Sequence, residues 1–459
     1  MKTILICFPE MLGYCANIFY EIGCFLKKKG YDLVYACSSP YMERYRKVSF
    51  KEVGQVFYLS EFLQKYSREE SRLIKNEEDY WFAYPSFVKM KYILGRHMNQ
   101  WQDYIVQRVF FQRIFDSKRI DMVVSEPPST AFGILCFQEA QKRGVPFFGY
   151  ISSPVGRVFN VCTDLFCTRM IRNPFPVARE DIVTEQPIYM STIYNRLGSV
   201  LIPIPFPLDQ ILSRLFAFLR IPNEKSIETG HMKLWQFYSV MRLLQRKMIF
   251  TITDALQCFQ NDVDDDYEET INILYPLQFP VENTSYVHAR EYSNDEEIIR
   301  NISFSISDRY RLYVKEHPGA VGMRDVKFFR RVRSFPNVRI LHPTKFHLRK
   351  SIQKFDIVVT KTGTVGFEAL QKNIPVILLG RTYYENYPGV YRLYCFCDLG
   401  RLISGLGKAN VSENKQVLED YLQYCFVGIY NEVSSLSLEA ENIRNLVKPI
   451  ELYFEGLCS

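Results

Sequence analysis

The chain has 459 residues, 47% hydrophobic and 23% charged, and its 57 Lys and Arg outnumber its 50 Asp and Glu to give a formal charge of +7. This composition is typical of a soluble globular protein and excludes disordered, collagen-like and coiled-coil chains. The basic excess forms no long run of Lys or Arg, which argues against a nucleic-acid partner but suits an anionic ligand or a membrane surface. A chain of this length predicts about two or three domains.

The cysteines and the apolar runs predict a cytoplasmic protein. The 12 cysteines are scattered, with no pair of CxxC motifs, which is typical of reduced thiols. The apolar N-terminal stretch is interrupted by Pro9 and Glu10, so we expect a strand there and not a signal peptide. The apolar stretch 199–222 contains several prolines and charges, which a membrane-spanning helix of about 20 residues rarely combines.

The first part of the chain alternates predicted strands and helices. Strands are predicted over residues 3–8, 32–36, 121–125 and 145–151. Helices are predicted up to Lys29 and over 129–143, and residues 60–115 are predicted to be mostly helical. Because parallel strands need such crossovers, residues 1–160 predict an open, Rossmann-like α/β domain.

The alternation then stops, and residues 161–262 are interpreted as a helical insertion and linker. A basic helix is predicted over 232–249, and the acidic segment 262–269 marks a domain boundary, because its charges need solvent. The stretch 199–220 and the basic helix are candidates for peripheral contact with the inner face of a membrane. Packing between domains is the alternative.

Alternation resumes after this boundary. Strands are predicted over residues 271–277, 310–314, 338–341, 356–360 and 375–379. Helices are predicted over residues 295–302, 324–333, 347–353 and 365–372. Residues 263–410 therefore predict a second doubly wound domain, and residues 411–459 predict C-terminal helices that close the structure.

Ligands of open α/β sheets bind beyond the carboxyl ends of the strands, so the loops there hold the candidate residues. After the strand that ends at residue 314, Lys315 and His317 carry groups that can donate hydrogen bonds to a phosphate. The alternative is a surface turn set by Pro318.

A second loop precedes the helix predicted over 365–372. The small residues Thr362, Gly363 and Thr364 allow close approach of a phosphate to a helix N-terminus, and Glu368 lies about one turn further on. In the alternative, Thr362 is only a helix cap and Gly363 only a turn residue.

A third loop, over residues 380–389, contains Arg381 and three tyrosines, which suit an anion and a base or sugar. The alternative is that the tyrosines only pack locally. Together the three loops predict one binding crevice.

These loops carry a resemblance to a known family. The shared residues are Tyr275, Pro276, Leu277, Gln278, Lys315, Glu316, His317, Pro318, Thr362, Gly363, Thr364, Val365, Gly366, Phe367 and Glu368. In their order and spacing they resemble the bacterial capsule polysaccharide biosynthesis proteins, which include Kdo-transferase-like GT-B glycosyltransferases.

The resemblance implies two Rossmann-like domains facing a cleft, with the activated sugar on the C-terminal domain and the acceptor on the N-terminal one. It further implies that His317 contacts the donor phosphate, that residues 362–364 hold it and that Glu368 lies near the nucleoside. The acidic-Gly-aromatic-Leu-Arg segment of Kdo-transferring members is not evident in the sequence, so the resemblance does not identify the sugar.

Two carboxylates are candidates for the catalytic base or nucleophile. Glu10 follows the first predicted strand, and Glu126 follows the strand over 121–125. Glu126 is preferred because Pro127 and Pro128 restrict its loop; the alternative for both is a solvated loop carboxylate. Arg157 is a candidate anion contact, or else an ordinary surface arginine.

The sequence thus predicts a glycosyltransferase that moves a sugar from a nucleotide-activated donor, CMP-Kdo-like or another nucleotide sugar, to a surface polysaccharide or lipid-linked glycan. No metal or other cofactor is predicted, because no cluster of ligands has metal-type spacing. The alternatives are a CDP-polyol phosphotransferase and a non-catalytic glycan-binding or export subunit of the same fold.

Overall fold

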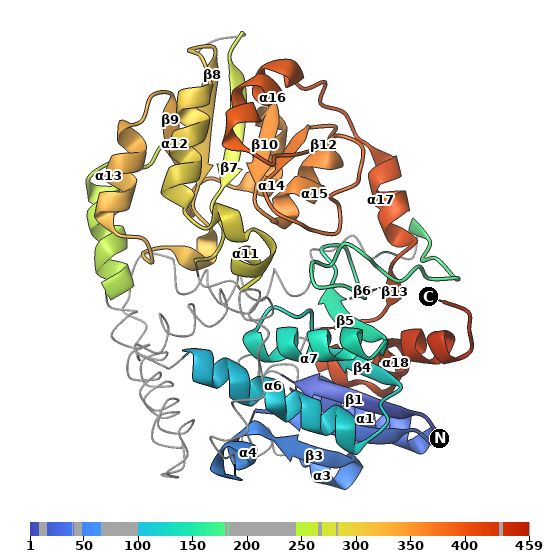
Figure 1. The fold of residues 1–459 in the computed structure, drawn as a ribbon. Coiled ribbons are helices and arrows are strands. Elements are labelled where there is room, and N and C mark those ends of the chain that lie inside the picture. Colours follow the sequence, from blue (N-terminus) through green and yellow to red (C-terminus); the bar gives the residue numbers. More distant parts are fainter. Residues whose placement is uncertain are drawn as a thin grey trace. The chain divides into compact units, whose positions relative to one another are not determined.

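The computed structural model describes residues 1–8, 16–38, 40, 48–65, 100–179, 182, 245–264, 269–280, 283–430 and 435–458. These residues form two compact units (Figure 1). The first contains the described residues up to 182 together with those from Asp420 onward, and the second contains the described residues from 245 to Glu419. Each is built on one mostly parallel sheet, so the predicted fold class, α/β with two Rossmann-like units, is confirmed.

The sheet of the first unit has the order β13-β6-β5-β4-β1-β2-β3. Its strands are β1 (Thr3–Phe8), β2 (Asp32–Cys37), β3 (Gln55–Tyr58), β4 (Met122–Ser125), β5 (Phe147–Ser152), β6 (Val158–Cys162) and β13 (Phe426–Val427). Strands β1 to β5 are parallel, whereas β6 and β13 pair in the antiparallel sense. The strand order reverses between β1 and β4, and such a reversal is where open α/β sheets form a ligand crevice.

The first unit also contains helices, and the last of them lies close to the C-terminus of the chain. They are α1 (Ala16–Lys28), α3 (Phe50–Val53), α4 (Leu59–Lys65), α6 (Gln100–Ser117), α7 (Ala131–Lys142), the 3-10 turn η8 (Ser435–Leu438) and α18 (Ala440–Phe454). Tyr150 of β5 donates its hydroxyl to the Leu446 carbonyl of α18 at 2.7 Å, and the rings of Phe148 and Tyr453 lie 5.3 Å apart. The C-terminal helix therefore packs on the N-terminal sheet.

The second sheet has the order β12-β11-β10-β7-β8-β9, and all of its pairs are parallel. Its strands are β7 (Ile271–Pro276), β8 (Tyr310–Lys315), β9 (Val338–Leu341), β10 (Ile357–Thr360), β11 (Val376–Leu378) and β12 (Val390–Arg392). Counted from β7 this is the Rossmann order 3-2-1-4-5-6, with its switch point between β7 and β10. These strands are short apolar runs, as expected when helices cover both faces.

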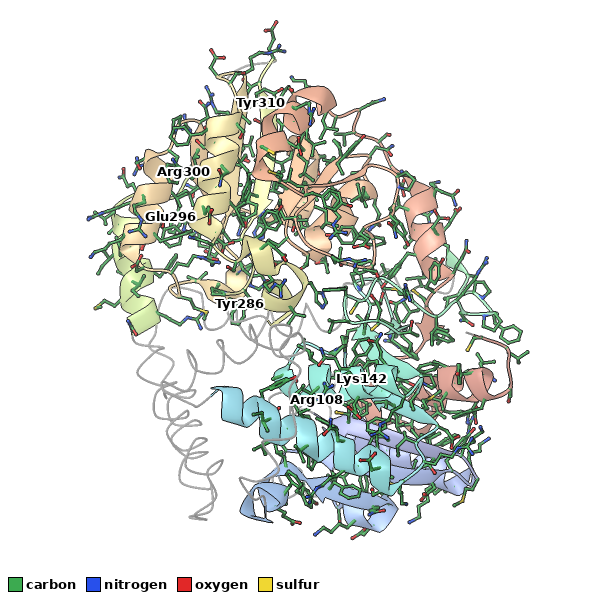
Figure 2. The ribbon with its side chains drawn as sticks, in the orientation of Figure 1. Arg108, Lys142, Tyr286, Glu296, Arg300 and Tyr310 are labelled. Atoms are coloured by element: carbon green, nitrogen blue, oxygen red, sulfur yellow. The ribbon has the colours of Figure 1, made fainter. Side chains whose placement is uncertain are left out.

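The second unit has a helix over residues 245–255 and further helices that connect the strands. These are α11 (Asn283–His288), η4 (Arg290–Tyr292), α12 (Asp295–Ser305), η5 (Pro318–Ala320), α13 (Val326–Ser334), α14 (Leu348–Ser351), η6 (Ile352–Lys354), α15 (Thr364–Leu370), η7 (Phe396–Asp398), α16 (Leu399–Leu406) and α17 (Lys415–Leu422), which runs into the first unit. Glu296 and Arg300 lie on α12, and Tyr310 begins β8 (Figure 2). Asn294 caps α12 by accepting the N–H groups of Glu296 and Glu297 at 3.1 and 3.4 Å.

Part of the predicted middle segment lies outside the described residues. Residues 183–244 are among these, so of the basic helix expected over 232–249 only its last residues are described, and they are helical. The stretch 199–220, the other candidate for membrane contact, lies wholly outside. No helix among the described residues combines the length and apolar character needed to cross a bilayer.

Candidate functional site

The loops that follow β7, β8 and β10 lie at the carboxyl edge of the second sheet. Strands β7 and β10 flank the switch point, and β8 is the other neighbour of β7. The structure therefore brings to one edge the residues predicted to bind the donor phosphate, which are Lys315, His317, Thr362, Gly363 and Thr364.

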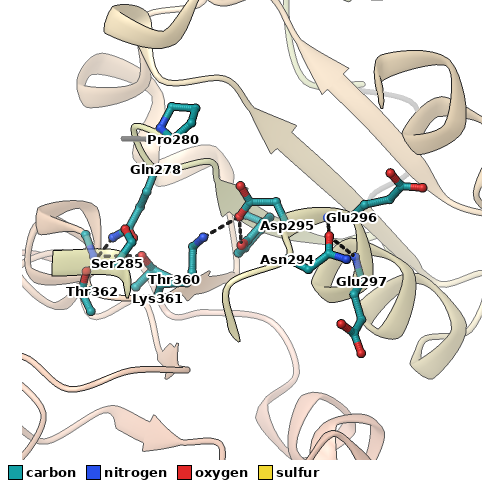
Figure 3. Close-up of polar contacts among 12 residues, drawn as sticks. Gln278, Pro280, Ser285, Asn294, Asp295, Glu296, Glu297, Thr360, Lys361 and Thr362 are labelled. Atoms are coloured by element: carbon teal, nitrogen blue, oxygen red, sulfur yellow. Dashed lines mark hydrogen bonds and ion pairs between the residues drawn. The ribbon is translucent and has the colours of Figure 1, made fainter. Parts of the chain in front are cut away.

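Gln278, the second residue after β7, bridges the two loops of the switch point. Its carboxamide satisfies all of its neighbours when the oxygen faces the β10 loop. The oxygen then accepts the N–H groups of Thr362 at 3.1 Å and Gly363 at 2.9 Å and the Thr362 hydroxyl at 2.8 Å, while the nitrogen donates to the hydroxyl of Ser285. Figure 3 shows Gln278 between Ser285 and Thr362. Gln278 is one of the residues that carry the family resemblance, but the sequence predicts no role for it.

This bridge changes which backbone groups a ligand can reach. Gln278 occupies the N–H groups of Thr362 and Gly363, two of those predicted to hold the phosphate. The next N–H groups, those of Thr364 and Val365, belong to the first turn of α15, where a helix supplies no acceptor of its own. Thr364 is exposed, whereas Thr362 and Gly363 are partly buried, so Thr364 is the most exposed residue of this loop.

Tyr384, from the loop after β11, supports the β10 loop from below. It is fully buried, and its hydroxyl donates to the Gly363 carbonyl at 2.5 Å. A Cβ atom at Gly366 would collide with the Tyr384 hydroxyl, so the close packing requires glycine there. The neighbouring Tyr383 packs its ring 5.5 Å from that of Phe367. Tyr384 therefore has a structural role, but it packs against the β10 loop and α15 and not only within its own loop.

Asp295, the first residue of α12, accepts three hydrogen bonds beneath the loops. Lys361 and Arg324 each contact its carboxylate at 2.7 Å, and the Tyr275 hydroxyl donates to it at 2.8 Å (Figure 3 shows the contact with Lys361). Burial alone would raise the pKa of Asp295, but the charges of Lys361 and Arg324 outweigh it and hold that pKa below its usual value.

Arg324 links Asp295 to the loop after β8. Its guanidinium donates to Glu316 Oε1 at 2.7 Å and to the Gln278 carbonyl at 3.0 Å. Glu316 also accepts the N–H of His317 at 2.7 Å. Burial raises the pKa of Glu316 above its ordinary value, although Arg324 opposes this effect. The loop that carries His317 is thus tied to the β7 loop through a buried ion pair.

Lys315 lies under the same loop and does not point to solvent. It is 4% exposed, and its ammonium donates to the carbonyls of Glu316 at 3.1 Å and Pro343 at 2.7 Å. Burial lowers the pKa of Lys315 to about 8, against a smaller opposite effect of Glu316. Lys315 therefore carries its charge at neutral pH without a direct path to a ligand.

These charged residues form a buried charge cluster of Lys315, Arg324, Lys361, Asp295 and Glu316. Three cations against two carboxylates give a net charge of 3 − 2 = +1 at neutral pH. In a site of low dielectric constant, an unbalanced positive charge favours an anion at the nearby surface.

His317 presents a defined hydrogen-bond donor at this edge. Its Nδ1 accepts the N–H of Gly319 at 3.0 Å, so the proton of the neutral ring lies on Nε2. Burial, reinforced by the charges of Lys315 and Arg324, lowers the pKa of His317 to about 4, which keeps the ring neutral at pH 7. The ring lies 5.8 Å from that of Phe279, the residue after Gln278. His317 and the start of α15 therefore flank the same segment after β7.

Glu368 and Arg381 have partners of their own in the structure. Glu368 accepts from Arg349 at 2.9 Å, and its burial raises its pKa against the opposing charge of Arg349. Arg381 donates to both carboxylate oxygens of Glu385, at 2.8 and 3.2 Å. An anion bound by Arg381 would have to share it with Glu385.

The candidates of the first unit lie near the reversal of its sheet or in a turn. Glu126 follows β4 directly and is 5% exposed. Glu10, after β1, lies outside the described residues. Arg157 is exposed in the turn between β5 and β6, and its carbonyl accepts the N–H of Gly428 at 3.0 Å. In the part of the chain that the structure describes, no three His, Cys, Asp or Glu side chains are grouped as metal ligands.

Comparisons with known proteins relate the second unit to a family. Residues 239–392 match the model described as capsule polysaccharide biosynthesis protein, a range that contains the loops after β7, β8, β10 and β11. A comparison with curated proteins finds no match.

Similar solved structures have low sequence identity. The Thermosulfurimonas dismutans protein KpsC, described as a beta Kdo 2,7 transferase, is 12% identical over 77% of this chain and 98% of its own, with a TM-score of 0.33. S. aureus MnaA with UDP is 12% identical over 100% of this chain and 98% of its own, with a TM-score of 0.30. Acinetobacter baumannii MurG is 10% identical over 98% of this chain and 99% of its own, with a TM-score of 0.29. At these TM-scores the function has to be argued from the chain's own residues.

Proposed function

We propose that the protein is a glycosyltransferase that uses a nucleotide-activated sugar, from the premise that residues 239–392 match the model of the capsule polysaccharide biosynthesis proteins. The donor binds by its phosphate at the carboxyl edge of the second sheet. The observation that carries this proposal is the pairing of a neutral His317, held as an Nε2–H donor, with a buried charge cluster of net charge +1.

This arrangement suits the chemistry of glycosyl transfer. As the bond from the sugar to the phosphate breaks, negative charge develops on the leaving nucleotide, and fixed donors stabilise that charge. His317 Nε2–H and the N–H and hydroxyl of Thr364 are the proposed donors to the phosphate. The buried charge cluster adds a positive field without giving up its own hydrogen bonds. Glu368, paired with Arg349, is proposed to lie at the nucleoside.

The acceptor is proposed to be a glycan or glycolipid that binds to the first unit. An acceptor hydroxyl has to lose its proton as it attacks the sugar, and a carboxylate can take that proton. Glu126 is the proposed base, because it follows β4 at the reversal of the first sheet. Glu10, which follows β1 in the sequence, is the alternative base, because β1 is the other strand at this reversal.

A CDP-polyol phosphotransferase would use the same donors to a phosphate. The two reactions differ in the bond that forms, a glycosidic bond in one and a phosphodiester in the other. Analysis of the product by mass spectrometry distinguishes them, and a new phosphodiester would replace the proposed reaction by the alternative.

The proposed site is tested by titrating CMP and UDP into the wild type, His317→Ala and the control His347→Ala. We expect His317→Ala to lower the affinity for whichever nucleotide binds by roughly 10- to 100-fold, because a hydrogen bond to a charged group contributes about 1.5–3 kcal/mol. His347 is exposed before α14, and its variant should bind like the wild type. Equal affinity of all three proteins would remove His317 from the site.

A further inference from the structure

We infer that Arg246 is a positioning residue that holds His317 in its binding conformation. This inference rests on the proposed function, in which His317 contacts the donor phosphate. It assigns a role to the helix over residues 245–255, which precedes the second sheet in the chain.

Arg246 bridges two carbonyl groups of the loop that follows His317. Its Nη2 donates to the Gly319 carbonyl at 2.6 Å, and its Nε donates to the Val321 carbonyl at 3.0 Å. Because the guanidinium is planar and rigid, two such bonds fix both the position and the orientation of this loop relative to the helix.

The loop in turn fixes the imidazole. Gly319, whose carbonyl Arg246 holds, donates its own N–H to His317 Nδ1 at 3.0 Å. The N–H of Ala320 also donates to the His317 carbonyl at 2.8 Å. A shift of Gly319 would remove the donor to Nδ1, and the ring would then be free to change its tautomer or rotate. Arg246 thus acts on Nε2–H through Gly319.

Gly322 provides independent evidence that the helix over residues 245–255 and the loop after β8 are in close contact. It has a φ of 73°, in the left-handed region that favours glycine. A Cβ atom at this position would collide with the backbone carbonyl of Arg246. Any larger residue would therefore push the helix away from the loop, even though the Arg246 side chain is unchanged.

The far end of the helix is anchored on the next loop of the sheet. Asp254 lies 3.4 Å from His342 Nε2, and the His342 Nδ1 accepts the N–H groups of Thr344 at 3.2 Å and Lys345 at 3.1 Å. The ring of Phe250 packs 6.0 Å from the His342 ring. The helix therefore contacts the loops after both β8 and β9. The contacts at the second loop restrict movement of the helix and so keep Arg246 in position to bind Gly319.

A double-mutant cycle with Arg246→Ala and His317→Ala tests the inference, with CMP and UDP as the probes and isothermal titration as the measurement. We expect Arg246→Ala to weaken nucleotide binding by about tenfold, within the range for directly coupled residues. In the His317→Ala background the same change should have no further effect. Lys247→Ala, on the exposed side of the same helix, should bind like the wild type.

Two further variants distinguish a positioning role of Arg246 from an effect of its charge alone and from a loss of folding. Arg246→Lys keeps the charge but replaces the planar, rigid guanidinium by a flexible ammonium that does not fix the orientation of the two carbonyls, so we expect it to bind nearly as weakly as Arg246→Ala. Gly322→Ala keeps the guanidinium but displaces the helix, and it should also weaken binding only when His317 is present. Thermal unfolding of each variant identifies any that does not fold. If one of Arg246→Ala, Arg246→Lys and Gly322→Ala does not fold, the other two are used for the double-mutant cycle with His317→Ala.

The outcomes distinguish this inference from the proposed function. Wild-type affinity in His317→Ala would remove His317 from the proposed phosphate site and would overturn the inference with it. If His317→Ala weakens binding but the Arg246 effect is absent or simply additive, the site stands and the positioning role is overturned. Wild-type binding by Arg246→Lys would likewise overturn it in favour of a charge effect.

Discussion

Replacing Arg324 by Ala is expected to destabilise the second unit by about 3–5 kcal/mol, the usual cost of breaking a buried ion pair. Asp295 and Glu316 would each lose a cation that contacts them at 2.7 Å. Their side chains are only 12% and 1% exposed, so solvent cannot replace the lost hydrogen bonds. The loops after β7 and β8 would also lose their shared contact. Urea unfolding, followed by a signal specific to the second unit, measures the effect.

Arg331→Ala is the matched control for this experiment. Arg331 pairs with Glu296 of α12, but its side chain is 52% exposed, and solvent weakens exposed ion pairs so that they contribute little to stability. A loss in Arg324→Ala that is no larger than that in Arg331→Ala would contradict the importance given to the buried charge cluster.

Replacing Glu126 by Gln is expected to slow sugar transfer by about 10²- to 10⁴-fold, the usual contribution of a general base. Gln has nearly the same shape as Glu, so the buried position next to β4 should still fold. Because Glu126 belongs to the first unit and the proposed phosphate site to the second, nucleotide affinity should stay at the wild-type value. The measurement is the turnover of a nucleotide sugar with an acceptor that supports reaction in the wild type.

Glu52→Gln serves as the control, since Glu52 is an exposed carboxylate on α3 of the same unit. If Glu126→Gln retains the turnover of this control, Glu126 is not the base, and Glu10→Gln is the next variant to assay.

Much of the second unit could be predicted from the sequence because its strands are buried on both faces. Such strands appear as short apolar runs between helical segments, and the ranges expected for β7 to β11 match the structure closely. Other strands carry a weaker local signal. β12 has three residues and β13 only two, and β13 exists because Phe426 pairs with Phe159, far away in the chain.

The loops of the site could be located from the sequence, but not the contacts within them. Gln278 and Thr362 are 84 positions apart, and no local pattern indicates that one occupies the backbone donors of the other. The same holds for Arg324, which contacts Asp295 across 29 positions. Lys315 appeared in the sequence as a ligand-facing cation, but burial and two carbonyl partners give it a supporting place below the loop.

The prediction for the end of the chain was limited in a similar way. Helices could be expected after residue 411 from their periodicity. That α18 returns to the first sheet depends on contacts such as Tyr150 with Leu446, which are separated by 296 positions. Amphipathic character indicates that a helix packs against something, but not which sheet it covers.

A crystal structure of the protein with bound CMP or UDP tests the central claim most directly. We expect a phosphate oxygen within about 3 Å of His317 Nε2 and of the Thr364 N–H or hydroxyl, with the Gln278 carboxamide still bound to Thr362 and Gly363. A nucleotide whose phosphate lies away from both His317 and the start of α15 would contradict the account.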